Sequence, residues 1–208
     1  MNQKTKWNAR KLTMTGMLAA VAFVLMFLDF SVPVMPSFIK MDFSELPALI
    51  GAFAMGPVSG AAICVVKNIL HLTITTTGGV GELSNMILGL AFVIPAGLVY
   101  NYRRTMRGGI LGALLGAVTM AVISVFTNYF VVYPVYTSFM PMETIIQAYQ
   151  MINPNVENLW QALIWFNMPF TFIKGLSCVL ITILVYKPLS PLIKGTRLKT
   201  GEATKTAH

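Results

Sequence analysis

The chain has 208 residues, of which 56% are hydrophobic and only 11% charged, and its formal net charge is +8 at pH 7. Soluble domains carry about 25% charged residues, so this composition excludes a protein whose whole surface faces water. The apolar runs are long and continuous, which excludes the short alternating strands of a membrane β-barrel. We therefore predict an all-α integral membrane protein that contacts lipid.

Six apolar segments are predicted to cross the membrane as one compact bundle, because a spanning helix needs roughly 20 apolar residues. The second segment is short, and a polar loop at 137–157 precedes the last one. We assign residues 1–193 to a single six-helix membrane domain and residues 194–208 to a polar, disordered C-terminal tail. The predicted segments are 12–31, 45–56, 57–75, 82–102, 108–134 and a last one that ends near Tyr186.

The charged residues are divided between the two sides of this topology. Cytoplasmic loops of membrane proteins carry excess Lys and Arg. Most basic residues of the chain fall in the N-terminus, the 102–108 connector and the C-terminus, whereas most acidic residues fall on the other side. We therefore predict that both termini are cytoplasmic. The net charge reflects this orientation and requires no nucleic acid as a partner.

Two lysines, Lys67 and Lys174, are expected inside the membrane, where a charge is costly and usually faces a cavity or a partner. At about 1.5 Å per helical residue, Lys174 lies about 20 Å outward of Lys187, in the outer half. Lys67 lies near mid-depth, and it either pairs with Glu82 or a backbone carbonyl or belongs to a ligand site. His71, one turn further out, is more typical of an interior histidine with a partner of its own.

Polar side chains gather in the outer half of the predicted membrane region, and the inner half of the same segments is almost purely apolar. This distribution predicts a small-molecule pocket that is open to the outside and closed below. For Asn85 and Asn128, hydrogen bonding between helices is an equally open interpretation. The candidate binding residues are Asp42, Lys67, Glu82, Asn85, Asn128, Asn167, Thr171 and Lys174.

The sequence contains no motif that indicates catalysis. It has no nucleophile–base pair, no HExxH metal-binding motif and no GxxxxGK[ST] phosphate loop. We therefore predict no catalytic residue, no metal and no cofactor. Cys64 and Cys178 lack a CxxC spacing or a histidine partner and are interpreted as buried small hydrophobes.

Small residues recur at a spacing of four in the first predicted segment, in the pairs Thr15–Ala19 and Gly16–Ala20. In lipid, such a spacing lets another helix approach closely. Two interpretations stay open, namely packing within the same chain and docking onto a partner membrane protein.

Five stretches of the chain resemble one known family in order and spacing. The chain resembles the substrate-binding (S) subunits of energy-coupling factor (ECF) transporters, the bacterial vitamin importers, and within them the riboflavin-specific type. These stretches are "MLAAVAFVL", "KMDFSELPALIGAFAMGPVSGAAICVVKNILH", "VGELSNMILGLAFVIPAGL", "NYFVVYPVY" and "PFTFIKG".

The resemblance implies a multi-pass subunit of the bacterial plasma membrane that captures riboflavin from outside. It also implies a membrane coupling subunit and two cytoplasmic ATPase subunits as partners. Gly16 and Ala20 match the family's docking surface, and Asn128 and Lys174 match its ligand site. Thr171 stands where the family has an asparagine, so another vitamin or a flavin nucleotide stays open as the ligand. An intramembrane enzyme and a secondary transporter are the alternatives from other classes.

Overall fold

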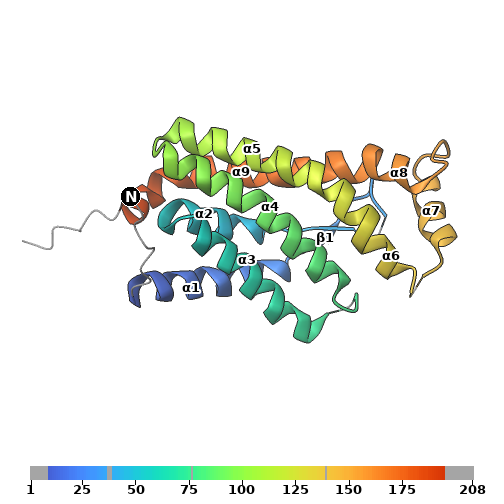
Figure 1. The fold of residues 1–208 in the computed structure, drawn as a ribbon, viewed down its shortest axis with the longest axis horizontal. Helices are drawn as coiled ribbons and strands as arrows, with labels where there is room; N and C mark the ends of the chain where they lie inside the picture. Colours follow the sequence, from blue (N-terminus) through green and yellow to red (C-terminus); the bar gives the residue numbers. More distant parts are fainter. Residues whose placement is uncertain (1–8, 37–38, 76, 139, 195–208) are drawn as a thin grey trace, which may run out of the picture.

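The computed structural model describes residues 9–36, 39–75, 77–138 and 140–194. Its helices form an elongated bundle (Figure 1), which confirms the predicted all-α fold class. The described strands are β1 (Phe30–Ser31) and β2 (Lys40–Met41), which pair antiparallel with Phe30 opposite Met41. The predicted tail lies, from residue 195 onward, outside the described residues.

Five helical segments of the described chain are long and apolar enough to cross a membrane. The last two contain a π-helical turn within an otherwise continuous helix. The segments are α1 (Ala9–Met26), α3 (Pro57–His71) with the 3₁₀ turn η1 (Leu72–Ile74), α4 (Val80–Tyr102), α5 (Met106–Thr127) with the π turn η2 (Asn128–Val132) and α6 (Tyr133–Tyr136), and α8 (Leu159–Ala162) with the π turn η3 (Leu163–Asn167) and α9 (Met168–Lys194).

The second predicted segment forms α2 (Glu45–Met55), which has only 11 residues. At about 1.5 Å per residue it is about 16 Å long, roughly half the thickness of the hydrocarbon. The first predicted segment is also shorter than expected, because the helix ends at Met26 and the chain becomes extended in β1. The described chain therefore has five candidate spans, and α2 is a short and largely buried helix.

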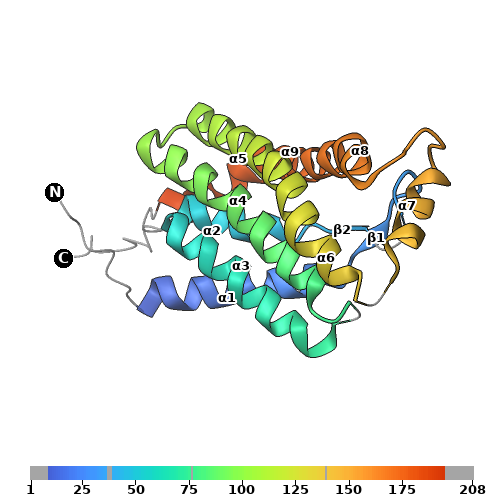
Figure 2. The same ribbon diagram turned by 45° about the vertical axis from the view of Figure 1, so that its right-hand side comes forward.

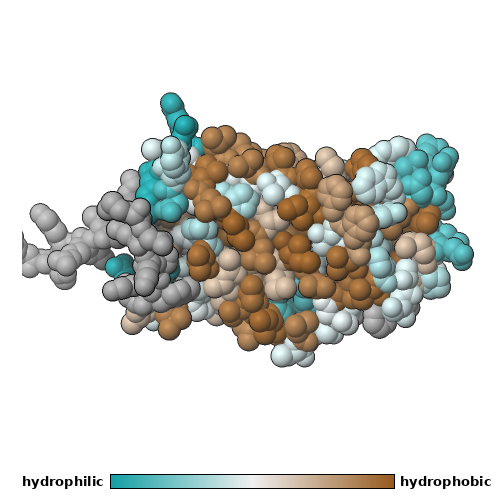
Figure 3. Space-filling model, viewed as in Figure 1, coloured by the Kyte–Doolittle hydropathy of each residue, from teal (hydrophilic) through white to brown (hydrophobic). Residues whose placement is uncertain are grey.

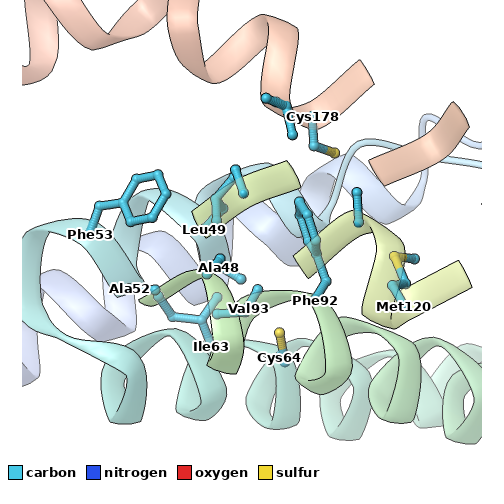
Figure 4. Close-up of a cluster of buried hydrophobic side chains, with 14 of the residues drawn as sticks. Ala48, Leu49, Ala52, Phe53, Ile63, Cys64, Phe92, Val93, Met120 and Cys178 are labelled. Atoms are coloured by element: carbon cyan, nitrogen blue, oxygen red, sulfur yellow. The ribbon is translucent and has the colours of Figure 1, made fainter. Parts of the chain in front are cut away.

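Two close helix contacts in the core depend on glycine. A Cβ atom at position 116 of α5 would lie 2.3 Å from the backbone oxygen of Phe92 in α4, and one at position 60 of α3 would lie 2.8 Å from that of Ala48. Side chains from α2, α3 and α4 meet beside these contacts (Figure 4), where Leu49, Ile63 and Phe92 are fully buried. Small residues thus bring the helix backbones together in this half of the bundle.

The two buried cysteines belong to the same core. Cys64 and Cys178 are both fully buried and free of disulfides. The interpretation of these residues as small buried hydrophobes is confirmed.

The other end of the bundle is closed by a helix that the sequence predicted as a polar loop. α7 (Met142–Gln150) lies there and contacts α8 (Figure 1 and Figure 2). It is anchored by Ile145 and Tyr149, which are four residues apart and buried on one face against Leu163. The loop assignment of 137–157 is wrong at these residues, because one apolar face was hidden among polar neighbours.

The outer surface has the polarity expected of a membrane protein. A broad hydrophobic band crosses the middle of the molecule, with hydrophilic residues at the ends (Figure 3). Exposed large apolar side chains on different helices, such as Leu98, Phe130 and Ile173, contribute to the apolar surface. The start of α1, the α4–α5 connector and the last turns of α9 lie at one end of the bundle (Figure 1).

Candidate functional site

A cavity of about 390 Å³ lies between α3, α4, α9, the two π turns and the segment around β2. This size falls within the range of small-molecule sites. Every candidate binding residue except Lys67 lines the cavity, and Glu45 joins them. The seven are Asp42, Glu82, Asn85, Asn128, Asn167, Thr171 and Lys174.

Two lysines and two carboxylates form one cluster at the cavity, and three of these residues, Asp42, Glu45 and Lys174, line it. The Nζ of Lys174 lies 2.8 Å from Oδ2 of Asp42 and 3.3 Å from Oε2 of Glu45. The Nζ of Lys67 lies 3.0 Å from Oε1 of Glu45 and donates to the hydroxyl of Ser44. All four ionisable residues are buried, and we call them the buried quartet: Asp42, Glu45, Lys67 and Lys174. Two positive and two negative formal charges cancel within this cluster.

Asp42 is the member of the buried quartet that lies outside the helices. Burial alone would raise the pKa of its carboxyl, but the ammonium of Lys174 and then that of Lys67 outweigh burial. They hold the pKa of Asp42 well below its usual range. The carboxylate is therefore ionised, and it also accepts from the Ser44 backbone N–H at 2.8 Å.

Lys67 corrects one expectation. The predicted pairing of Lys67 with Glu82 or a backbone carbonyl is wrong, because its Nζ is turned toward the first turn of α2. Lys67 is fully buried behind Glu45 and does not line the cavity. The sequence places Glu45 only among the acidic residues of the outer side, and Glu45 is not one of the predicted binding residues. Its place in the first turn of an apolar helix, next to a segment with a buried lysine, was the available signal.

Glu82 is held at the rim by groups from the end of α3 and the following turn. Its Oε1 lies 2.7 Å from Nδ1 of His71. Its Oε2 accepts from the hydroxyls of Thr75 at 2.9 Å and Thr77 at 3.2 Å. His71 thus has the partner of its own that its position suggested, and both oxygens of Glu82 are engaged within the protein.

The three asparagines that line the cavity differ in how many of their hydrogen-bonding groups already have a partner within the protein. Asn167 bonds to two tyrosines, and Asn85 donates to Oδ2 of Asp42 at 3.3 Å while its own Oδ1 has no partner in the described chain. The side chain of Asn128 is 7% exposed and has no hydrogen bond to any described residue. Bonding within the protein therefore accounts for Asn167 and half of Asn85, but not for Asn128.

The chain matches the family model described as "ECF transporter, substrate-specific component" over residues 10–186. It therefore belongs to the substrate-specific components of ECF transporters. It is 30% identical to the riboflavin transporter RibU of Staphylococcus aureus (strain TCH60) over 197 residues, which cover 93% of this chain and 99% of the relative.

Two further comparisons agree. The riboflavin transporter FmnP of Bacillus subtilis (strain 168) is 30% identical over 191 residues, which cover 90% of this chain and 96% of the relative. A solved structure described as the S component of a bacterial ECF transporter superposes with a TM-score of 0.71 at 30% identity. It covers 89% of this chain and 98% of that one.

The small residues of α1 in this S component lie on two different faces. Thr15 and Ala19 are buried within the chain, and the Thr15 hydroxyl contacts the sulfur of Met55 at 3.7 Å. Gly16 and Ala20 are exposed, and a Cβ added at Gly16 would meet no atom within 4 Å. The first pair serves packing within the chain, and the second pair is accessible to a partner.

The basic side chains that line this S component's cavity are all placed beside carboxylates. Among the lining residues, Lys174 faces Asp42, the Nζ of Lys40 lies 2.9 Å from Asp29, and His71 faces Glu82. Within the described part of the chain, no three His, Cys, Asp or Glu side chains are grouped so that they could hold a metal ion.

Proposed function

We propose that this S component binds riboflavin from outside the bacterial cell and delivers it to a membrane coupling subunit. The observation that carries the proposal is the cavity of about 390 Å³, in which amides with open hydrogen-bonding capacity stand among apolar side chains. A flavin ring and its ribityl chain need this combination of apolar walls and polar partners. Relatives that align with nearly the whole chain at 30% identity are riboflavin transporters by name.

The charges of the cavity favour a neutral flavin over its phosphorylated form. A phosphate would enter beside the carboxylates of Asp42, Glu45 and Glu82, and the basic side chains next to them are already paired with these carboxylates. Burying an anion without a free cation is costly. We therefore expect riboflavin to bind at least about tenfold more tightly than flavin mononucleotide, a difference of about 1.4 kcal/mol.

The orientation follows from the charge distribution. The end that carries the start of α1 and the α4–α5 connector with Arg103, Arg104 and Arg107 faces the cytoplasm. Both termini are then cytoplasmic, α2 is the short sixth helix, and the cavity opens outward. The chain itself is not an enzyme and needs no cofactor, and two cytoplasmic ATPase subunits power transport.

The test is a titration of the detergent-purified protein. Riboflavin fluorescence is expected to be quenched on binding, and protein that retains riboflavin during purification should be yellow. Flavin mononucleotide, titrated in parallel, reports the expected discrimination. A colourless preparation that neither binds added riboflavin nor quenches its fluorescence would overturn the proposal, and equal affinities would overturn only the charge argument.

Docking is tested by replacing Gly16 with tryptophan. Because this position is exposed and does not line the cavity, riboflavin binding should be unchanged, whereas uptake by cells that carry the coupling module should be lost. Leu111→Trp on lipid-exposed α5, at 54% exposure, is the matched control and should keep both activities. Loss of binding in Gly16→Trp would indicate disturbed folding, and normal uptake would exclude docking at this face.

A further inference from the structure

A closed ring of hydrogen bonds connects the cavity wall at η3 to α7. It joins Tyr133 of α6, Tyr149 of α7 and Asn167 at the last position of η3. The hydroxyl of Tyr149 donates to Oδ1 of Asn167, the Nδ2 of Asn167 lies 3.5 Å from the hydroxyl of Tyr133, and the two hydroxyls bond to each other. The exposed fractions of the three residues are 2%, 0% and 5%. Solvent therefore does not compete for these bonds.

The proton count gives the ring a direction. Each tyrosine hydroxyl has one proton to donate. With Tyr149 donating to Asn167, Tyr133 donates to Tyr149 and accepts from the amide nitrogen of Asn167. The contact of Oδ1 with Tyr149 is shorter than that of Nδ2 with Tyr133, as expected because O–H···O bonds are shorter than N–H···O bonds. The amide oxygen of Asn167 thus faces the ring.

The ring uses one of the two N–H bonds of the Asn167 amide. The other N–H has no acceptor among the described residues, and Asn167 lines the cavity. Asn167 therefore presents a hydrogen-bond donor to whatever occupies the cavity. Without the ring, the amide could turn over and present its oxygen instead.

Tyr149 itself does not line the cavity. It reaches the site from α7, the helix at the outer end of the bundle, and its ring packs on Phe166 with centroids 5.6 Å apart. π turns recur at functional sites, and here η3 ends on the residue that Tyr149 holds. A residue outside the cavity thus controls the orientation of one inside it.

We propose that Tyr149 is a positioning residue, which fixes Asn167 as a hydrogen-bond donor and so selects ligands that present an acceptor, such as a ring carbonyl or ring nitrogen, at this wall. The identity of the ligand rests on the proposed function. The role of α7 is to carry Tyr149, because the hydroxyl of Tyr149 closes the ring and so holds the orientation of the Asn167 amide.

Tyr149→Phe removes the hydroxyl and keeps the aromatic packing. Riboflavin affinity, measured by fluorescence quenching, is expected to fall about five- to tenfold, the effect of one buried hydrogen bond. Tyr102→Phe, which removes an exposed hydroxyl at the far end of α4, is the control and should bind like the wild type. Equal affinity in Tyr149→Phe and Tyr102→Phe would overturn the proposal.

A double-mutant cycle separates positioning from general structural support. In an Asn167→Leu background, Tyr149→Phe should cost no further affinity, because the group that Tyr149 positions is already absent. The same loss in both backgrounds would show that Tyr149 acts only on stability and would overturn the positioning role.

A measurement on the wild-type protein tests the proposal even if the Tyr149→Phe variant does not fold. Riboflavin should slow amide hydrogen exchange in α7, since ligand at Asn167 tightens the ring through Tyr149, and unchanged exchange would count against the proposal. Wild-type protein that binds no riboflavin would overturn the proposed function. Wild-type binding with no effect of Tyr149→Phe would overturn the present inference alone.

Discussion

Lys174→Met is expected to lower the free energy of unfolding of the unliganded protein by about 3–5 kcal/mol, because it leaves buried carboxylates without their cation. Asp42 would lose its contact at 2.8 Å, and Glu45 would keep only Lys67. Riboflavin affinity should fall at least about tenfold, or about 1.4 kcal/mol. Thermal unfolding in detergent and fluorescence titration measure the two effects.

Two controls make this result specific to the buried quartet. Lys40→Met removes a cation from Asp29 at an exposed pair and should cost no more than about 1 kcal/mol. Lys174→Met combined with Asp42→Asn removes one charge of each sign and should recover much of the lost stability. Unchanged stability and affinity in the single variant would contradict the assigned role of Lys174.

Gly116→Leu is expected to prevent stable packing of α5 on α4, at a cost of about 3 kcal/mol or more. The backbone oxygen of Phe92 would lie 2.3 Å from the new Cβ, so the helices must move apart. Size-exclusion profiles and unfolding temperatures in detergent report the loss. Gly16→Leu, at a position with no neighbour within 4 Å, is the matched control and should fold normally. Equal behaviour of the two variants would contradict the close approach.

The sequence could predict that polar residues gather at one site, because the position of each residue along its helix gives its depth in the membrane. Asn85, Asn128 and Lys174 come from different helices, and their similar distance from the membrane surface was enough to bring them to one cavity. Depth does not give the direction in which a side chain points around its helix. For this reason the sequence left Lys67 open between a pairing with Glu82 or a backbone carbonyl and a ligand site, whereas its Nζ faces Glu45.

The end of the molecule that carries α7 was less predictable. The two buried residues of α7, Ile145 and Tyr149, have the spacing of one helix face, which would have identified α7. The surrounding segment, however, is polar overall. The π turns that contain Asn128 and Asn167 arise from a shift in backbone hydrogen bonding that no residue type dictates. The closed ring of the two tyrosines and Asn167 depends on all three elements and was therefore not visible in the sequence.

The quartet also sets an order for biosynthesis. Glu45 and Lys67 are 22 positions apart on neighbouring helices, so a growing chain can neutralise them against each other early. Asp42 and Lys174 are separated by 132 positions, so the carboxylate has no Lys174 ammonium until the final helix is made. A chain that stops before α9 lacks Lys174, so the buried carboxylates beside the cavity carry one negative charge that is not neutralised. Riboflavin capture is thus a property that only the nearly finished polypeptide acquires.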